Sequence, residues 1–386
     1  MLKHFNKNPL ARATIIAMGL SCGTSAMALT TDDIEIHGFF TAGATISDTE
    51  KTYGRTTDND VAFDEDTVLG VQIIVPIDDK LTLQAQFLAN GSKETDVNFD
   101  TTVDWAFASY AATDNLTVRG GRIRAPLLMH MEYGEVGYAY PWIRPPQEVY
   151  SLIPFNSFDG FDALYSFPTM GGIDLVLQPF VGNKDDELLA RQFGGAVIDT
   201  EIDNIHGLKV ALSSEYVTFV VSYSNLDVTI EGGGPVPVPP APVPGLTYAD
   251  RLETEILNVG LTIDWNNFLF MSEYVDVDPD DPGALTEIPI PNNQAWYATV
   301  GYRFGKFMPH VTFAEMDSDD IALGGTTSET LTVGLRYELS PSAALKFEWA
   351  NVEPQDGSIG LFTVSPIDPD VTDDADIFSV AIDVIF

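Results

Sequence analysis

The sequence predicts an all-β protein, a transmembrane antiparallel up-and-down β-barrel of about 16 strands. Three observations predict this fold class. Apolar and polar residues alternate with a period of two along most of the chain, as in a strand whose two faces meet different environments. The connections between these segments alternate between short and long. After the N-terminal region the chain has no run of about 18 apolar residues, so no spanning helix is expected.

Residues 1–28 are predicted to be a secretory signal peptide that is cleaved off. The basic residues that open it are Lys3, Lys7 and Arg12. A short apolar segment, 13–20, and a small-x-small cleavage site, Ala26–Ala28, follow them. Cys22 leaves a lipoprotein as an alternative, although the residues before it fit a lipoprotein box poorly. Residues 29–386 are then a single barrel domain.

Acidic residues far outnumber basic ones, with 57 Asp and Glu against 19 Lys and Arg and a formal net charge of −38. Removal of the signal makes the chain more acidic still, because the signal contains basic residues and no carboxylates. Such a chain repels nucleic acid, so binding to DNA or RNA is excluded. The one Cys lies in the signal, and the mature chain must therefore be stabilised without disulfides.

Each predicted strand is long enough to cross a membrane when tilted, which takes about nine to eleven residues. The predicted strands are 34–47, 65–76, 81–90, 102–113, 116–126, 159–168, 173–183, 205–214, 217–230, 251–264, 268–278, 294–305, 307–316, 328–339, 343–353 and 376–386. The last strand alternates most clearly. Its predicted lipid-facing residues are Phe378, Val380, Ile382, Val384 and Phe386. Its predicted water-facing residues are Ser379, Ala381 and Asp383.

The connections predict which ends of the strands lie together. Short turns are expected at 77–80, 114–115, 265–267, 305–306 and 340–342. Long loops are expected at about 48–64, 91–101, 127–158, 183–204, 231–250, 279–293, 317–327 and 353–375. Short turns at one end and long polar loops at the other are typical of bacterial outer-membrane barrels. A soluble β-sandwich or propeller is the alternative, but it explains neither the one-sided loops nor the even strand count.

The polar faces of the strands carry Thr, Ser, Gln, Lys, Glu and Arg, which a soluble core would not tolerate unpaired. In a barrel of about 16 strands these faces would line a lumen wide enough for water. The fold prediction therefore leads to a functional one, a water-filled interior.

The stretch Leu116–Tyr150, LTVRGGRIRAPLLMHMEYGEVGYAYPWIRPPQEVY, resembles the fifth strand and following segment of proteobacterial outer-membrane general porins. The first strand, with Ile34-Glu-Ile-His-Gly-Phe-Phe, and the last strand, with its terminal Phe386, share the resemblance. The resemblance implies that segment 127–158 folds inward as a constriction loop. It also implies a homotrimer, and a C-terminal Phe386 read by the barrel-assembly machinery as an insertion signal.

Charged residues around this segment are the candidate site. The predicted basic side of the pore constriction is Arg119, Arg122, Arg124 and Arg144. The predicted acidic side is Glu132, Glu135, Asp159 and Asp162. A bulge at Gly120-Gly121 would turn the first three arginines to the lumen together. Opposed charges across a narrow pore would filter solutes by charge. The alternative, that these are structural ion pairs pinning the loop to the wall, stays open.

Two acidic clusters in long loops are weak metal candidates. Their carboxylates are Asp276, Asp278, Asp280, Asp317 and Asp319. Divalent cations bound there could bridge to lipopolysaccharide, because spaced carboxylates suit hard cations. A solvated run of charge is the stronger interpretation, since neither cluster matches an EF-hand loop. No cofactor is expected.

The expected function is a porin of the Gram-negative outer membrane, a channel for passive diffusion of small hydrophilic solutes and ions. Its other expected partners are outer-membrane lipid and lipopolysaccharide. A receptor or adhesion scaffold with an occluded lumen is the alternative from another class, and a barrel hydrolase is a third. The chain is not expected to be an enzyme, because it has neither a G-x-S-x-G elbow nor an H-E-x-x-H helix.

Overall fold

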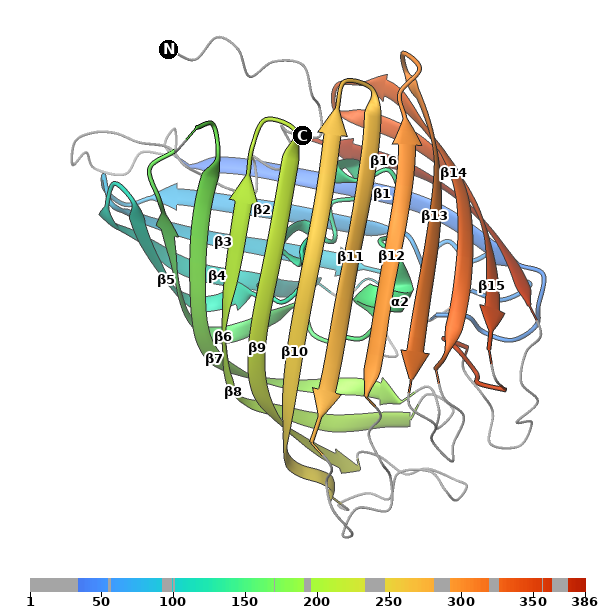
Figure 1. Ribbon diagram of the computed structural model, residues 1–386, viewed down its shortest axis with the longest axis horizontal. Helices are drawn as coiled ribbons and strands as arrows, with labels where there is room; N and C mark the ends of the chain where they lie inside the picture. The colour runs from blue at the N-terminus through green and yellow to red at the C-terminus, as the bar shows by residue number, and fades with distance from the viewer. Residues whose placement is uncertain are drawn as a thin grey trace.

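The computed structural model describes residues 34–386 apart from 55–56, 92–98, 100, 170, 191–195, 233–246, 281–291, 319–325, 356 and 363–373. In this part of the chain, sixteen antiparallel strands form one closed barrel, and each strand pairs with its neighbours in the sequence. Figure 1 shows the strands following one another around the wall. The fold class predicted from the alternation is confirmed. The predicted signal peptide lies outside the described residues and stays a prediction.

The first eight strands are β1 (Glu35–Ser47), β2 (Val68–Pro76), β3 (Leu81–Asn90), β4 (Thr101–Thr113), β5 (Leu116–Arg124), β6 (Ser157–Ser166), β7 (Asp174–Ala190) and β8 (Ala196–Ser213). The other eight are β9 (Val217–Gly232), β10 (Thr247–Trp265), β11 (Phe268–Pro279), β12 (Asn293–Tyr302), β13 (Phe307–Ser318), β14 (Ser328–Ser340), β15 (Ala343–Pro354) and β16 (Ala375–Ile385). Three short helical turns lie between β5 and β6. They are η2 (Met131–Tyr133), η3 (Gly137–Ala139) and α2 (Gln147–Tyr150). No helix among the described residues is long and apolar enough to cross a membrane.

The barrel closes where β1 pairs with β16, from Phe39 opposite Ile385 to Ser47 opposite Ile377. The C-terminal residue extends this seam, because the backbone N–H of Phe386 donates to the carbonyl oxygen of Gly38 at 2.9 Å. Closure leaves no open sheet edge, so the backbone groups of the wall bond to one another, as a spanning structure requires.

The side chains of each strand divide between two faces as the alternation predicts. In β16, Phe378 is 53% exposed on the outer face, whereas Asp383 is 1% exposed on the inner face. In β14, Leu331 is 40% exposed outside and Arg336 is 1% exposed inside. Large apolar side chains therefore cover the outside of the barrel, and polar and charged ones point inward.

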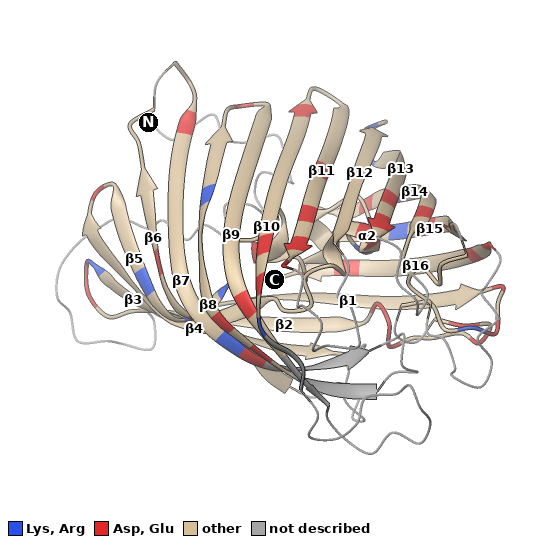
Figure 2. Ribbon diagram, turned by 60° about the horizontal axis from the view of Figure 1, so that its bottom comes forward, with Lys and Arg blue, Asp and Glu red and all other residues tan. Residues whose placement is uncertain are grey.

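Carboxylates lie on the outer face where several strands approach the long loops. Glu315 of β13 lies opposite Glu329 of β14, which in turn lies opposite Glu353 of β15. On the neighbouring wall, Glu255 of β10 lies opposite Asp278 of β11. Figure 2 shows acidic residues at these strand ends. They bound the apolar outer surface on the side of the long loops.

Two predicted loops are wrong in extent. The segment expected as a long loop at 183–204 is strand over 183–190 and 196–204, because β7 and β8 continue there as a paired ladder. Of the segment expected at 231–250, residues 231–232 end β9 and residues 247–250 begin β10, and 233–246 lie outside the described residues. Alternation did not reveal these extensions, because charged residues follow one another there without a period of two, as in Lys184-Asp185-Asp186-Glu187.

Candidate functional site

The connection between β5 and β6, residues 125–156, folds into the barrel, as Figure 1 shows for the segment that carries α2. We call it the inner loop; it corresponds to the predicted constriction loop 127–158. Its apolar side chains are buried against inward-facing side chains of the wall in one cluster. The residues that the inner loop contributes to this cluster include Leu127, Leu128, Met131, Tyr140, Trp142, Val149, Ile153 and Phe155. The interior is therefore partly an apolar core, which the predicted polar lumen did not include.

Trp142 fixes the middle of the inner loop to β12 and β13. Its ring is 1% exposed and meets the ring of Tyr297 edge-on, with centroids 5.4 Å apart. Its indole N–H donates to the hydroxyls of Thr299 at 3.1 Å and Thr312 at 2.9 Å. A buried Trp needs such a partner for its N–H, and two neighbouring strands supply it.

Glu273 of β11 is a buried anchor for the same loop. Its carboxylate accepts hydrogen bonds from the backbone N–H of Met129 at 2.6 Å and from the hydroxyl of Tyr150 at 2.6 Å. The wall donates as well, through Asn258 at 2.9 Å and Tyr297 at 3.3 Å. Four hydrogen-bond donors compensate the loss of hydration of this buried carboxylate. Because Met129 and Tyr150 are two of these donors, one side chain of the wall holds the loop at two places.

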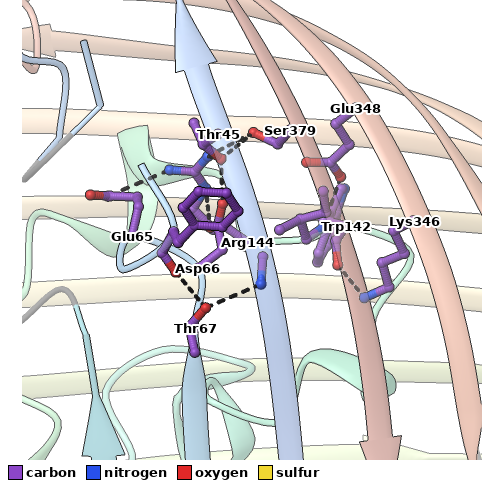
Figure 3. Close-up of polar contacts among 12 residues, drawn as sticks. Thr45, Glu65, Asp66, Thr67, Trp142, Arg144, Lys346, Glu348 and Ser379 are labelled. Carbon is purple, nitrogen blue, oxygen red and sulfur yellow. Dashed lines mark hydrogen bonds and ion pairs between the residues drawn. The ribbon is translucent and has the colours of Figure 1, made fainter. Parts of the chain in front are cut away.

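A second anchor, the Arg144 latch, joins the inner loop to the residues that precede β2 (Figure 3). The Nε of Arg144 lies 2.9 Å from Oδ1 of Asp66, and its Nη1 lies 3.5 Å from Glu65. Its Nη2 also donates to Ser379 of β16 at 3.1 Å. Burial raises the pKa of Asp66, while the charge of Arg144 and the hydroxyl of Thr45 act in the opposite direction.

Basic side chains of β14 and β15 bind the backbone of the inner loop. Arg336 donates to the carbonyl oxygens of Tyr138 at 2.6 Å and Tyr140 at 2.5 Å. Lys346 donates to the carbonyl oxygen of Gly137 at 2.7 Å and lies 2.8 Å from the Asp383 carboxylate. Loop carbonyls that would otherwise be orphaned inside the barrel are thereby satisfied.

The arginines of the predicted basic side do not all face the lumen together. Arg119 points inward, where it forms a two-point ion pair with Asp162 and lies 4.0 Å from Glu132. Arg124, the last residue of β5, donates to Asp104 at 2.6 Å and 3.0 Å. Arg144 forms the latch with Asp66, beside β1 and β16. The inward arginines of this set are thus all held by carboxylates.

Arg122 lies on the outer face, paired with Asp159 at 2.8 Å, and both side chains are well exposed. The predicted bulge at Gly120-Gly121 is wrong, because the register of β5 continues through both residues against β4 and β6. Gly121 instead has φ of 133°, and a Cβ there would lie 2.5 Å from the backbone oxygen of Ala106. The glycine permits a close approach of two strands and leaves the alternation unchanged.

The predicted acidic residues divide in the same way. Asp162 is buried beside Arg119, and Asp159 lies outside with Arg122. Glu132 and Glu135 lie on the inner loop and are partly exposed. Burial opposes the ionisation of Glu132, but the charges of Lys209 and Arg119 outweigh it, so the pKa of Glu132 lies below its ordinary value.

One stretch of the inner loop, 132–136, is partly exposed at every residue, whereas most of the loop is buried. Beyond Arg119, the wall from β2 to β5 presents inward-facing polar residues that are also partly exposed. They are Gln72, Gln84, Ser109 and Thr117. Val136 ends the stretch by packing against Phe39 and Leu88. We call the region between 132–136 and this wall the polar side of the interior.

Sequence reasoning missed several anchors of the inner loop, among them Glu273, Asp66 and Arg336. The sequence could have indicated two of them, because the alternation places the charged residues Glu273 and Arg336 on the inward faces of otherwise regular strands. His130 is a further buried polar group, and burial lowers its pKa to about 3. It is therefore neutral at ordinary pH and serves as a packing residue beside Tyr133, Tyr140 and Tyr150.

The weak metal candidates lie near the long loops. Asp276 and Asp278 are on the outer face of β11, Asp280 follows its end, and Asp317 is on the outer face of β13. Asp319 lies outside the described residues. In the part of the chain that the structure describes, no three His, Cys, Asp or Glu side chains come together as a metal site.

A sequence profile of the family described as Gram-negative porin matches residues 13–357. A search of curated proteins gives no match. Similar solved structures include OmpF of Salmonella typhi in complex with daunomycin, with 13% identity and a TM-score of 0.59 over 93% of this chain and 100% of that chain.

An anion-selective porin from Comamonas acidovorans has 13% identity and a TM-score of 0.52 over 92% of this chain and 99% of that chain. A trimer form of OmpT, an outer membrane protein of Vibrio cholerae, has 11% identity and a TM-score of 0.54 over the same shares. At these identities the likeness shows the barrel fold alone.

Proposed function

The chain belongs to the Gram-negative porin family, and we propose that it forms a water-filled channel for passive diffusion of small hydrophilic solutes and ions. One observation carries the proposal: the partly exposed polar side chains on the polar side of the interior. Side chains such as Ser109 and Thr117 offer hydrogen bonds to water, whereas the opposite wall is sealed by apolar contacts with the inner loop. The passage therefore runs along β2–β5, past residues 132–136. No chemical step is assigned to the chain.

Conductance across a planar bilayer tests the channel. The purified protein should give discrete, ohmic current steps, and their absence would contradict the proposal. A pair of variants on one strand locates the passage. Ser109→Trp places a large ring on the inner face of β4 and should lower the conductance. Ala108→Trp places the same ring on the outer face, opposite Gly120, and should leave the conductance unchanged.

We further propose that the protein is a homotrimer in the outer membrane, in contact with lipid and lipopolysaccharide. Support comes from the family and from the trimer form of the similar Vibrio cholerae protein. Current steps that occur in groups of three, together with the mass of the detergent-solubilised protein, test the trimer. A single-barrel mass would contradict it.

Phe386 is proposed as the signal that the barrel-assembly machinery reads. The side chain is 64% exposed at the seam of the barrel, where a partner can reach it. Deletion of Phe386 should lower the amount of protein assembled in the outer membrane, whereas Phe378→Leu, on the outer face of the same strand, should leave it unchanged. Equal assembly of both variants would contradict this role.

A further inference from the structure

Four neighbouring strands, β7 to β10, continue beyond the strands on either side of them. The pairing of β6 with β7 ends at Asn183, and the pairing of β11 with β10 ends at Thr254. Beyond these points β7 still pairs with β8 as far as Ala190, and β9 with β10 as far as Thr247. Among the described residues, strand pairing therefore joins this sheet to the barrel only through its own four strands. We call it the β7–β10 extension, and it consists of residues 184–190, 196–203, 227–232 and 247–252.

Irregular backbone marks the junction between the extension and the wall. Asn204 of β8 has φ of 52°, and the pairing of β8 with both of its neighbours shifts beside it. Arg251 of β10 also has φ of 52°, beside a shift in the pairing with β9. Residues other than glycine rarely adopt this left-handed conformation, and bulges bend a strand. In Figure 1 the ends of β7 and β8 turn out of the line of the wall and run sideways at the bottom of the view, so the junction is a bend.

The inward face of the extension is covered. Its first row beyond the bend contains Ile202, Val228 and Leu252, which lie opposite one another on neighbouring strands. Ile202 is 2% exposed and Leu252 is 5% exposed, and Ile202 belongs to the same apolar cluster as Phe155 of the inner loop. Glu201, on the other face of β8, is exposed. A sheet that stood straight out into water would expose both faces, so this sheet leans inward and packs on the apolar cluster.

Polar contacts connect the strands on the outer side of the bend. Oδ2 of Asp227 in β9 accepts hydrogen bonds from the side chain of Asn204 at 2.6 Å and from that of Arg251 at 3.0 Å. The backbone N–H of Arg251 also donates to the hydroxyl of Thr229 at 3.2 Å. The Arg251 side chain is 64% exposed, so its ion pair with Asp227 contributes little to stability. These contacts hold the extension together across three strands, and none of them fixes it to β6 or β11.

We propose that the β7–β10 extension is a lid that pivots at Asn204 and Arg251. In the position seen here it is closed on the apolar cluster and covers the part of the inner loop that belongs to that cluster. When the lid lifts, Ile202 and Leu252 leave the cluster and the inner loop loses one of its covers. Such a hinge needs only a few residues at the ends of elements whose φ and ψ can change. The consequence for current rests on the proposed channel, because a looser inner loop changes the width of the passage beside residues 132–136.

Amide hydrogen exchange of the protein in detergent tests the lid independently of any current. Ile202→Ala should speed exchange in residues 184–190 and 196–203 about tenfold or more, because truncation of a buried Ile weakens the closed position. Glu201→Ala, on the exposed face of the same strand, is the matched control and should leave exchange there unchanged. Equal exchange in the two variants would overturn the lid. Faster exchange in β13 as well would also overturn it, because the extension would then not open as a separate unit.

A second variant tests the pivot itself. Asn204→Gly keeps the left-handed conformation accessible and adds freedom to leave it, so exchange should rise in the extension and stay unchanged in β13. It also keeps the apolar contacts of Ile202, and it therefore serves if Ile202→Ala does not form a barrel. Unchanged exchange in the extension of Asn204→Gly would overturn the pivot.

Single-channel recording connects the lid to the passage. Ile202→Ala should make transitions between conductance levels several times more frequent, whereas Glu201→Ala should keep the frequency of the wild type. Faster exchange in Ile202→Ala with an unchanged current would overturn the effect of the lid on the passage. A protein that gives no current steps would overturn the proposed channel, and hydrogen exchange would still decide whether the extension is a lid.

Discussion

Arg144 of the inner loop lies 2.9 Å from the carboxylate of Asp66, and this ion pair joins the loop to the residues that precede β2. Asp66 is almost fully buried, with a side chain 1% exposed, and Arg144 is partly buried at 21%. A buried carboxylate without its partner is strongly unfavourable, so the two residues depend on each other more than an exposed pair would.

Arg144→Ala should therefore destabilise the protein by about 3 kcal/mol, because it leaves Asp66 buried without a counter-charge. The loop should also move more, which would appear as increased noise in the open-channel current. Asp66→Asn removes the orphaned charge, so the double variant should be more stable than Arg144→Ala alone. Urea unfolding of Arg144→Ala, Asp66→Asn and the double variant measures the coupling energy between the two residues. If the losses of unfolding free energy were additive, the ion pair would not act as a latch.

Glu148 predicts a pH dependence. It is buried in α2 and accepts a hydrogen bond from the hydroxyl of Thr330, and burial raises its pKa. Below the ordinary pKa of a Glu, both folded and unfolded chains hold the proton. Above it the unfolded chain releases the proton first, so this group lowers stability as pH rises, by up to about 1.4 kcal/mol per pH unit.

Glu148→Gln removes that proton equilibrium while keeping an acceptor for Thr330. Its melting temperature relative to the wild type should be higher at pH 8 than at pH 4. Glu329→Gln, on the outer face beside Thr330, is the control and should show a smaller pH-dependent difference. A Glu148→Gln protein whose relative stability is the same at both values would show that Glu148 does not resist ionisation in the fold.

Glu273 should be the most sensitive single anchor of the inner loop. Glu273→Leu leaves four donors without an acceptor, and each buried orphan costs about 1–3 kcal/mol. Glu273→Gln keeps one carbonyl oxygen and should lose less. Limited proteolysis of the inner loop reports its release, and Glu255→Gln on the outer face of β10 is the control. Equal protection of the loop in all variants would argue against the anchor.

The two arginines of β5 that lie three residues apart should behave differently. Arg122→Ala removes an exposed pair on the outer face and should change stability by about 1 kcal/mol or less, without changing ion selectivity. Arg119→Ala leaves Asp162 buried without its partner and should cost about 3 kcal/mol. Unfolding curves and reversal potentials of both variants test this contrast. A shift of selectivity in Arg122→Ala would place that side chain inside the barrel.

The fold was predictable because the period of two is a local property. The alternation from Phe378 to Phe386 places Asp383 inside, and the structure agrees. Arg122 was misplaced because a glycine pair in a strand permits either a bulge or a close approach of backbones, and the sequence does not distinguish them. The partners of Arg144 were not predictable for another reason. Asp66 and Ser379 are far from it in the sequence, and only the closed barrel brings them together.

Those distant partners have a consequence for assembly. The inner loop follows β5, but its anchors lie on strands made much later: Arg336 on β14, Lys346 on β15 and Ser379 on β16. The loop cannot reach its final position until the last strand has paired with the first. Until those strands are in place, the loop groups that they bind lack their native partners, so complete seating of the loop reports that the barrel has closed.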